Sequence, residues 1–396
     1  MKIYIHLNQT PVGTLAQKDN KIYFEYNKAF LKTGIQISPY KLALKAGVFR
    51  CDDDTFEGLW GVFADSLPDG WGRLLMDRHL MRLGVDPKSM TPLDRLAYVG
   101  EYGMGALRYE PVREIDEPIE EIILDDLARS SEAILEGSSE DMLDDLLALG
   151  GSSAGARPKV LVQLSSDKKD IIHGRQKLRD GFSHYMVKFS NALDDKESGA
   201  VEYAYALMAK VAGLEMPQAA LIEGKHGRYF VVERFDRVAD ERVHMHSVAG
   251  LVHADFRYPA LDYDDLMKLT LHLTKSYKEV SKMFRLACFN LFAHNRDDHA
   301  KNFSFLMDSK GVWRLSPAYD LTFSYGVGTE HSTMYVGEGR EPTEEHLAEL
   351  AKRFGIKDAK EVLAEVKEAV FGFEKIAREL GIANNTINAI AKQFVR

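Results

Sequence analysis

The sequence of 396 residues predicts an α+β fold, with a small N-terminal mixed β/α domain followed by a larger core of two lobes. Three patterns lead to this prediction. The first residues alternate apolar and polar side chains as strands do, the middle of the chain has strand patterns around one helix, and the last third has helical spacing. The chain is also longer than one hydrophobic core usually organises, which favours two or three domains.

A docking domain of strands and helices is expected over residues 1–110. Ile3, Ile5 and Leu7 alternate with neighbours that face the other way, and two further apolar runs follow short polar turns, so an antiparallel β meander is predicted. Between residues 59 and 83 the apolar spacing is helical. A Leu-Pro-Asp-Gly turn at 67–70 divides that region into two helices.

Residues 111–125 carry many carboxylates around two prolines and predict an acidic linker. A nucleotide-binding lobe is expected next, over residues 126–258. It contains a helical pattern that stops at Gly150-Gly151, and then strand, strand, helix and strand at 160–162, 185–189, 199–213 and 229–233. This is the element order of a kinase-type nucleotide lobe.

Residues 259–396 predict a helical catalytic lobe. Apolar residues recur with helical spacing over 263–273, 277–293 and 343–395. The fold class predicted for the whole chain is therefore an N-terminal mixed domain followed by a protein-kinase-like bilobal core with a helical C-terminal lobe.

The composition excludes several classes of protein. Lysine and arginine number 51 against 60 carboxylates, giving a net charge of −9, which argues against a generic nucleic-acid binder. The two cysteines, Cys51 and Cys288, have no metal-site or disulfide spacing. No signal peptide and no long apolar run is visible, so we expect a cytoplasmic protein without a membrane segment.

The most informative polar residues lie between 295 and 320. Asp297 can accept a proton from a hydroxyl group, and Asn302, five residues later, can bind Mg²⁺, which is the spacing of a kinase catalytic loop. Asp320 follows a short strand pattern and can bind a second Mg²⁺, although Leu-Thr rather than Phe-Gly comes after it. The alternatives are a polar loop that caps a helix and a turn aspartate.

Three further segments fit a nucleotide site. Lys188 ends an apolar strand, where an ammonium group is costly unless it is paired, for example with Glu202, or points into a polar cleft. The alternative is a lysine on an edge strand whose side chain reaches water. Glu233 and Phe235 close a strand where a kinase hinge contacts adenine, although a surface ion-pair cluster fits the same residues. A loop of small residues can bring its backbone amides close to phosphates. The alternative is a loop that only caps a helix. The candidate nucleotide-binding residues of this loop are Ser152, Ser153, Ala154, Gly155, Ala156 and Lys159.

A metal-dependent phosphohydrolase is an alternative function that the same region could support. His294, Asp297, Asp298 and His299 are all possible ligands of a divalent metal. No second cluster of this kind is visible elsewhere in the sequence, which disfavours this reading.

Taken together, the motifs resemble those of the HipA family of serine/threonine kinase toxins from bacterial toxin–antitoxin systems. The motifs of the core are SSAGARPK at 152–159, MVKFS at 186–190, VVERFDR at 231–237, NRDDHAKNFSF at 295–305 and PAYDLTFS at 317–324. Those of the N-terminal segment are VGTL at 12–15, FADSLPDGWGR at 63–73 and GEYGMGAL at 100–107. The resemblance covers nearly the whole chain.

The resemblance implies ATP and Mg²⁺ as cofactors. It implies that Asp297 is the base, that Asn302 and Asp320 hold Mg²⁺, and that Lys188 contacts phosphate. Glu233 and Phe235 would form the adenine site, and His299 and Lys301 match a histidine and a lysine of the family's catalytic loop. Asp298 stands where some relatives have glycine, which adds a negative charge near the metals.

The resemblance also implies regulation and partners. Ser152, or the adjacent Ser153, matches a loop serine whose autophosphorylation ejects the loop and switches the kinase off. The implied partners are a small helix-turn-helix antitoxin, operator DNA reached only through that antitoxin, and a protein substrate from the translation machinery such as an aminoacyl-tRNA synthetase. The competing hypothesis is a catalytically silent kinase-fold module that acts as a binding partner or co-repressor.

Overall fold

The computed structural model describes residues 1–113, 122–152, 155–190, 197–259 and 261–395. The predicted meander is present in it. An antiparallel five-stranded sheet has the order β4-β3-β2-β1-β5, with β1 at Lys2–Leu7, β2 at Thr10–Lys18, β3 at Lys21–Tyr26, β4 at Val48–Arg50 and β5 at Leu107–Glu110. The first helices are α1 at Lys28–Leu31, α2 at Gly61–Ala64, α3 at Gly70–Arg82, the 3₁₀ helix η1 at Pro87–Ser89 and α4 at Pro92–Val99.

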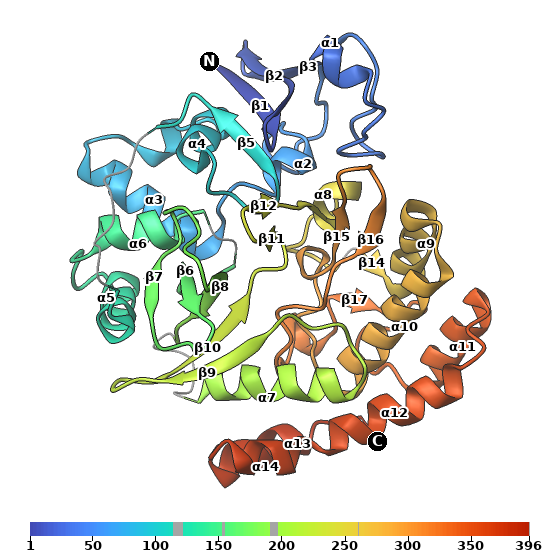
Figure 1. The fold of residues 1–396 in the computed structure, drawn as a ribbon. Helices are drawn as coiled ribbons and strands as arrows, with labels where there is room; N and C mark the ends of the chain where they lie inside the picture. The colour runs from blue at the N-terminus through green and yellow to red at the C-terminus, as the bar shows by residue number, and fades with distance from the viewer. Residues whose placement is uncertain (114–121, 153–154, 191–196, 260, 396) are drawn as a thin grey trace.

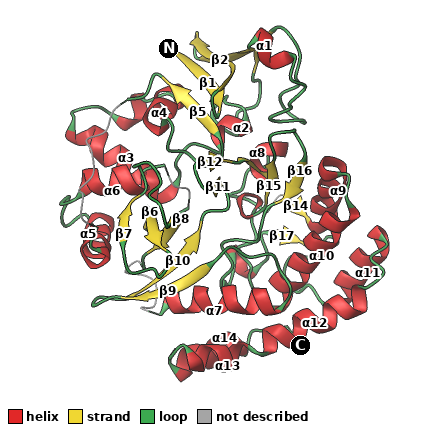
Figure 2. Ribbon diagram, viewed as in Figure 1, coloured by secondary structure: helices red, strands yellow, loops and turns green. Residues whose placement is uncertain are grey.

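A second antiparallel sheet forms the middle of the molecule, as Figures 1 and 2 show. Its order is β7-β6-β8-β10-β9, with β6 at Lys159–Ser165, β7 at Ile171–His173, β8 at Phe182–Lys188, β9 at Ala219–Glu223 and β10 at Arg228–Glu233. Around it lie α5 at Leu124–Glu136, α6 at Leu143–Gly150 and α7 at Ser198–Val211. The predicted strands at 160–162, 185–189 and 229–233 and the helix between them are thus confirmed as β6, β8, β10 and α7.

Short strands and helices complete the chain. The strands are β11 at Arg237–Val238, β12 at Glu241–Arg242, β13 at His244–Ser247, β14 at Leu261–Asp262, β15 at Ser304–Met307, β16 at Trp313–Leu315 and β17 at Thr333–Met334. The helices are α8 at Val248–Val252, α9 at Tyr263–Thr274, α10 at Tyr277–Phe292, the 3₁₀ turns η2 at Ala300–Asn302 and η3 at Val327–Thr329, α11 at Glu344–Phe354, α12 at Ala359–Phe371, α13 at Phe373–Glu379 and α14 at Asn384–Ala391. The expected helices after residue 260 are present.

Two hydrophobic clusters hold these elements together. The first extends from the N-terminal sheet through α7, α9 and α10 to the C-terminal helices. The second lies against the middle sheet and includes Trp71, Leu75 and Leu80 of α3 together with residues of α5 and α6. Helix α3 therefore packs on α6, beside which it lies in Figure 1, although it precedes the predicted boundary at residue 110.

The three-stranded sheet β13-β15-β16 similarly joins segments on both sides of residue 258. The domain boundaries predicted from sequence stay predictions, and residues 114–121 of the acidic linker lie outside the described residues. Over the described ranges no helix combines the length and apolar character needed to cross a bilayer.

Candidate active site

Lys188 ends β8, a central strand, and its side chain is only 9% exposed. Its ammonium group pairs with the Glu202 carboxylate of α7, and the Asp320 Oδ1 atom lies 2.5 Å from its Nζ. A buried ammonium group is stable only when paired in this way. The predicted pairing with Glu202 is confirmed, and the edge-strand alternative is wrong because β6 and β10 flank β8 on both sides.

The charges of this cluster stabilise each other. Burial lowers the pKa of Lys188, but the negative charges of Asp320 and Glu202 outweigh it and hold the pKa above its usual value. The charge of Lys188 in turn holds the pKa of Asp320 far below its usual range, against the effect of burial. Asp320 also has a left-handed backbone, with φ of 54°, a conformation that is uncommon for a residue other than glycine and collects at functional sites.

Asp297 lies in the loop after α10, and 53% of its side chain is exposed. Partial burial raises its pKa, the neighbouring His299 lowers it, and the negative charges of Asp320 and Asp298 raise it again. A carboxylate with a raised pKa is a better proton acceptor near neutral pH than an ordinary surface aspartate. The loops that carry the two carboxylates are joined directly, because the Tyr319 hydroxyl, next to Asp320, donates to the carbonyl of Lys301 at 2.5 Å.

Asn302 and His299 hold the same loop in place. The Asn302 Nδ2 atom donates to the backbone carbonyl of Asp297 at 2.7 Å, so the Oδ1 atom is the amide oxygen left for a cation. The His299 Nδ1 atom accepts from the amide of Lys301 at 3.3 Å, which assigns the ring proton to Nε2. That Nε2 atom is 4.0 Å from the Asp297 Oδ1 atom.

Asp298 faces away from this site into the helical lobe and is fully buried. Its carboxylate accepts hydrogen bonds from the Tyr263 hydroxyl at 2.9 Å, from His331 Nδ1 at 3.1 Å and from the Thr333 amide at 3.1 Å. Its charge is therefore compensated by three donors. Its negative charge raises the pKa of the adjacent Asp297, and its hydrogen bonds hold the loop in place rather than facing the expected metal site.

Lys159 lies directly opposite Lys188 on the neighbouring strand β6, so both side chains are on the same face of the sheet. Burial and the positive charge of Lys188 lower the pKa of Lys159 to about 8. Gly155 is next to it, because a Cβ atom on Gly155 would be 2.5 Å from the Lys159 Nζ atom. Arg157 approaches from the same loop, with its Nη1 atom 3.7 Å from Glu202 Oε2. These cations give the site an affinity for anions.

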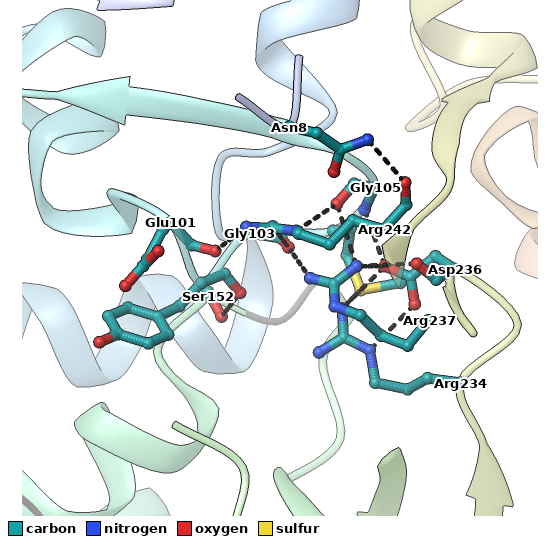
Figure 3. A network of polar contacts seen from close by, with 11 residues as sticks. Asn8, Glu101, Gly103, Gly105, Ser152, Arg234, Asp236, Arg237 and Arg242 are labelled. Atoms are coloured by element: carbon teal, nitrogen blue, oxygen red, sulfur yellow. Dashed lines mark hydrogen bonds and ion pairs between the residues drawn. The ribbon is translucent and has the colours of Figure 1, made fainter. Parts of the chain in front are cut away.

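Ser152 is turned toward the N-terminal domain. Its hydroxyl donates to the carbonyl of Tyr102 at 2.9 Å, and it lines a cavity of about 260 Å³ that Arg175 and Arg242 also line. Figure 3 shows Ser152 beside the arginine network around Asp236. Ala156 is exposed. The candidates Ser153 and Ala154 lie outside the described residues.

Phe235, one of the predicted hinge residues, lies next to the loop after β16 that carries Asp320. The Phe235 ring is 5.5 Å from the ring of Tyr319, the residue before Asp320. Glu233 ends β10, and its amide donates to the carbonyl of Gln218 at 2.8 Å. Arg234 and Asp236, by contrast, form a buried ion pair at 2.8 Å that turns inward, so the suggested surface ion-pair cluster is wrong.

The donor set fits Mg²⁺. Asp320 and Asn302 offer hard oxygen ligands, and Mg²⁺ typically takes one or two carboxylates while substrate phosphates and water complete the shell. The Asp320 carboxylate can serve both Lys188 and a cation, because it has about four acceptor positions. A hydrolase site built from His and Asp side chains is not favoured: within the described ranges no three His, Cys, Asp or Glu side chains are grouped as metal ligands.

Two family models match the chain. The HipA-like C-terminal domain matches residues 151–372, more than half of the sequence, and the HipA N-terminal domain matches residues 3–110. The chain belongs to the HipA family. The resemblance of its motifs to those of the HipA family is thereby confirmed.

Curated relatives and one solved structure extend this result. "Putative kinase Y4mE" of Sinorhizobium fredii is 28% identical over 354 residues, covering 83% of this chain and 77% of that protein. "Putative kinase Y4dM" of the same organism is 24% identical over 256 residues, 53% of this chain, and the match spans 62% of that relative, less than two thirds of its length. A chain in the complex of HipA, HipB and operator DNA of Shewanella oneidensis MR-1 aligns over 98% of this chain and 94% of its own length, with a TM-score of 0.70 and 17% identity.

The structural likeness concerns the fold. The predicted α+β class, an N-terminal mixed domain followed by a kinase-like core, is confirmed. The roles of the site residues stay predictions, although the structure brings Lys188, Asp297, Asn302 and Asp320 together. Sequence reasoning assigned no role to two residues that contact this site, Asp69 and Arg157. Both residues lie inside motifs quoted from the sequence, and this position is the signal by which they could have been found.

Proposed function

We propose that this HipA-family chain is an ATP- and Mg²⁺-dependent serine/threonine protein kinase that acts as the toxin of a toxin–antitoxin pair. The observation that carries the proposal is the cluster of Lys188 with Glu202 and Asp320 beside Asp297 and Asn302. Membership of the HipA family and relatives named as kinases support it.

Each residue has a physical task in the proposed reaction. Lys188 and Lys159 attract the phosphates of ATP, and the small-residue loop brings Gly155 next to Lys159. Asp297 accepts the proton of the attacking serine or threonine hydroxyl. Asn302 and Asp320 would hold Mg²⁺, which neutralises phosphate charge when it is bound. Glu233 and Phe235 would flank the adenine, and His299 would orient Asp297.

The partners belong to the same proposal. The fold is similar to that of a HipA structure that contains HipB and operator DNA, so we infer a small helix-turn-helix antitoxin and indirect binding of operator DNA. The proposed substrate is a protein of the translation machinery such as an aminoacyl-tRNA synthetase. Autophosphorylation is proposed at Ser152, with Ser153 as the neighbouring acceptor.

Transfer of labelled phosphate from ATP to proteins of a cell extract tests the proposal. Asp297→Asn should abolish the label and still bind nucleotide, because binding depends mainly on the lysines and the loop. Asp265→Asn is a matched control, since Asp265 is a similarly exposed aspartate (59%) on α9 that only approaches Lys268. Full transfer by Asp297→Asn would exclude Asp297 as the base. Nucleotide binding without any transfer by the wild-type chain would favour the silent binding module.

A further inference from the structure

The turn before α3 connects the N-terminal domain directly to two loops of the candidate site. Asp69, the residue before the first turn of α3, accepts the Gly155 amide with Oδ1 and pairs with the Lys301 ammonium group through Oδ2. These partners are 86 and 232 residues away in sequence. One carboxylate therefore joins the small-residue loop to the catalytic loop.

Gly70 and Trp71, which follow Asp69, also contact the small-residue loop. The Trp71 amide donates to the carbonyl of Gly155 at 2.9 Å, and the Trp71 indole donates to the carbonyl of Lys159 at 3.2 Å. Gly70 has a φ of 43°, and a Cβ atom there would be 2.5 Å from the Gly155 oxygen. Trp71 itself is 1% exposed in the second hydrophobic cluster, so the turn is anchored in the core.

Lys301 is restrained from the other side as well. Its ammonium group lies 4.2 Å from the centre of the Phe256 ring, and the Tyr319 hydroxyl donates to its carbonyl at 2.5 Å. A lysine side chain has four rotatable bonds and samples many positions unless it is held. Asp69 supplies the ionic contact that fixes the direction of the ammonium group.

We propose that Asp69 is a positioning residue for phosphoryl transfer, which holds the Gly155 amide and the Lys301 ammonium group in a fixed relation to each other. The proposal rests on the proposed kinase function. Phosphoryl transfer depends mainly on positioning and on preorganised charge, so a displaced cation or loop amide lowers the rate of the chemical step. The N-terminal domain is then a part of the catalytic machinery as well as a docking domain.

Kinetics of the full chain test the proposal. Asp69→Asn keeps an acceptor for the Gly155 amide but removes the charge that holds Lys301, and should lower kcat about 10- to 100-fold with a smaller change in KM for ATP. Asp77→Asn is the matched control, because Asp77 lies on the same helix and pairs with Arg73 at 2.8 Å. Lys301→Met and the double variant complete a mutant cycle. The double variant should be no slower than Lys301→Met alone, since Asp69 acts through Lys301.

Hydrogen exchange provides a readout that does not depend on activity. Asp69→Ala, which removes both contacts, should increase exchange of the Gly155 amide at least tenfold, and Asp77→Asn should not. Wild-type kcat in Asp69→Asn, a higher kcat, additive losses in the cycle, or an Asp69→Asn chain that does not fold would each overturn the proposal. If the wild-type chain transfers no phosphate, the proposed function has failed, and exchange alone then reports whether the Asp69 contact exists.

Discussion

Lys159 gives the sharpest test of the electrostatics of this site. The residue is 5% exposed and lies directly opposite Lys188 on the neighbouring strand. Burial and the charge of Lys188 lower its pKa from 10.5 to about 8. The folded chain therefore releases a proton that the unfolded chain keeps, and this difference makes the folded state less stable.

The size of this effect follows from the two pKa values. At pH 7 the lowered pKa of Lys159 costs the folded state about 3 kcal/mol, and at pH 9 about 2 kcal/mol. The cost is fully present below pH 8 and vanishes above pH 10.5, because the unfolded state then also loses the proton. Stability of the wild-type chain should thus rise with pH in this window as far as Lys159 is concerned.

Lys159→Met removes the charge and keeps most of the side-chain volume. We expect this variant to be more stable than the wild type at pH 7, by up to about 3 kcal/mol, and by about 1 kcal/mol less at pH 9. Urea unfolding of both chains at the two pH values measures the difference. The same variant should bind ATP more weakly, since a site that is strained by its charges is one that an anion stabilises.

Lys169→Met is a suitable control, because the Lys169 side chain, between β6 and β7, is 81% exposed. This control should change the free energy of unfolding by no more than about 0.5 kcal/mol at either pH. A Lys159→Met chain that is less stable than the wild type at pH 7, or a difference that does not shrink at pH 9, would refute the reasoning. Lys159 would then be stabilised by its neighbours rather than strained by them.

Two other substitutions test the site more simply. Ser152→Ala should abolish self-inactivation without loss of substrate phosphorylation, and phosphopeptide mapping checks it; label found only outside 150–159 would contradict the assignment. Asp298→Asn should lower the free energy of unfolding by about 1–3 kcal/mol, since its amide group would face one of three donors that now point at a carboxylate. Urea unfolding measures this loss, with Asp265→Asn as the control. Equal stability of the two variants would show that the buried hydrogen bonds of Asp298 do not stabilise the fold.

Local periodicity was enough to predict much of the fold. The alternation of Ile3, Ile5 and Leu7 gave the first strand, and helical spacing gave α7, α9 and α10. These signals are strong because each element buries one face, which imposes a repeat of two or of 3.6 residues on its own sequence. The need of a buried ammonium group for a partner likewise predicted the contact between Lys188 and Glu202.

Long-range packing was not predictable in the same way. Strands β7 and β13 have only three and four residues, too few for a period to show, and β13 is formed by His-Met-His-Ser. Helix α3 follows the first strands in sequence, yet its apolar residues belong to the second hydrophobic cluster. Nothing in the sequence near Asp69 or Asp298 indicates that one points into the candidate site and the other away from it, because each orientation is set by partners that are distant in sequence.

In the proposed kinase, the arrangement of charges around Lys188 would link nucleotide binding to metal binding. Lys188 satisfies two carboxylates, Glu202 and Asp320, and Glu202 is the more buried of the two. A phosphate group that attracts Lys188 weakens the contact with Asp320, while Glu202, which also has Arg157 as a neighbour, keeps its compensation. Asp320 then has more negative charge to share with a divalent cation, and its pKa is low enough that it stays ionised. Because such coupling is reciprocal, a cation at Asp320 would favour phosphate binding at Lys188 by the same free energy in the proposed reaction.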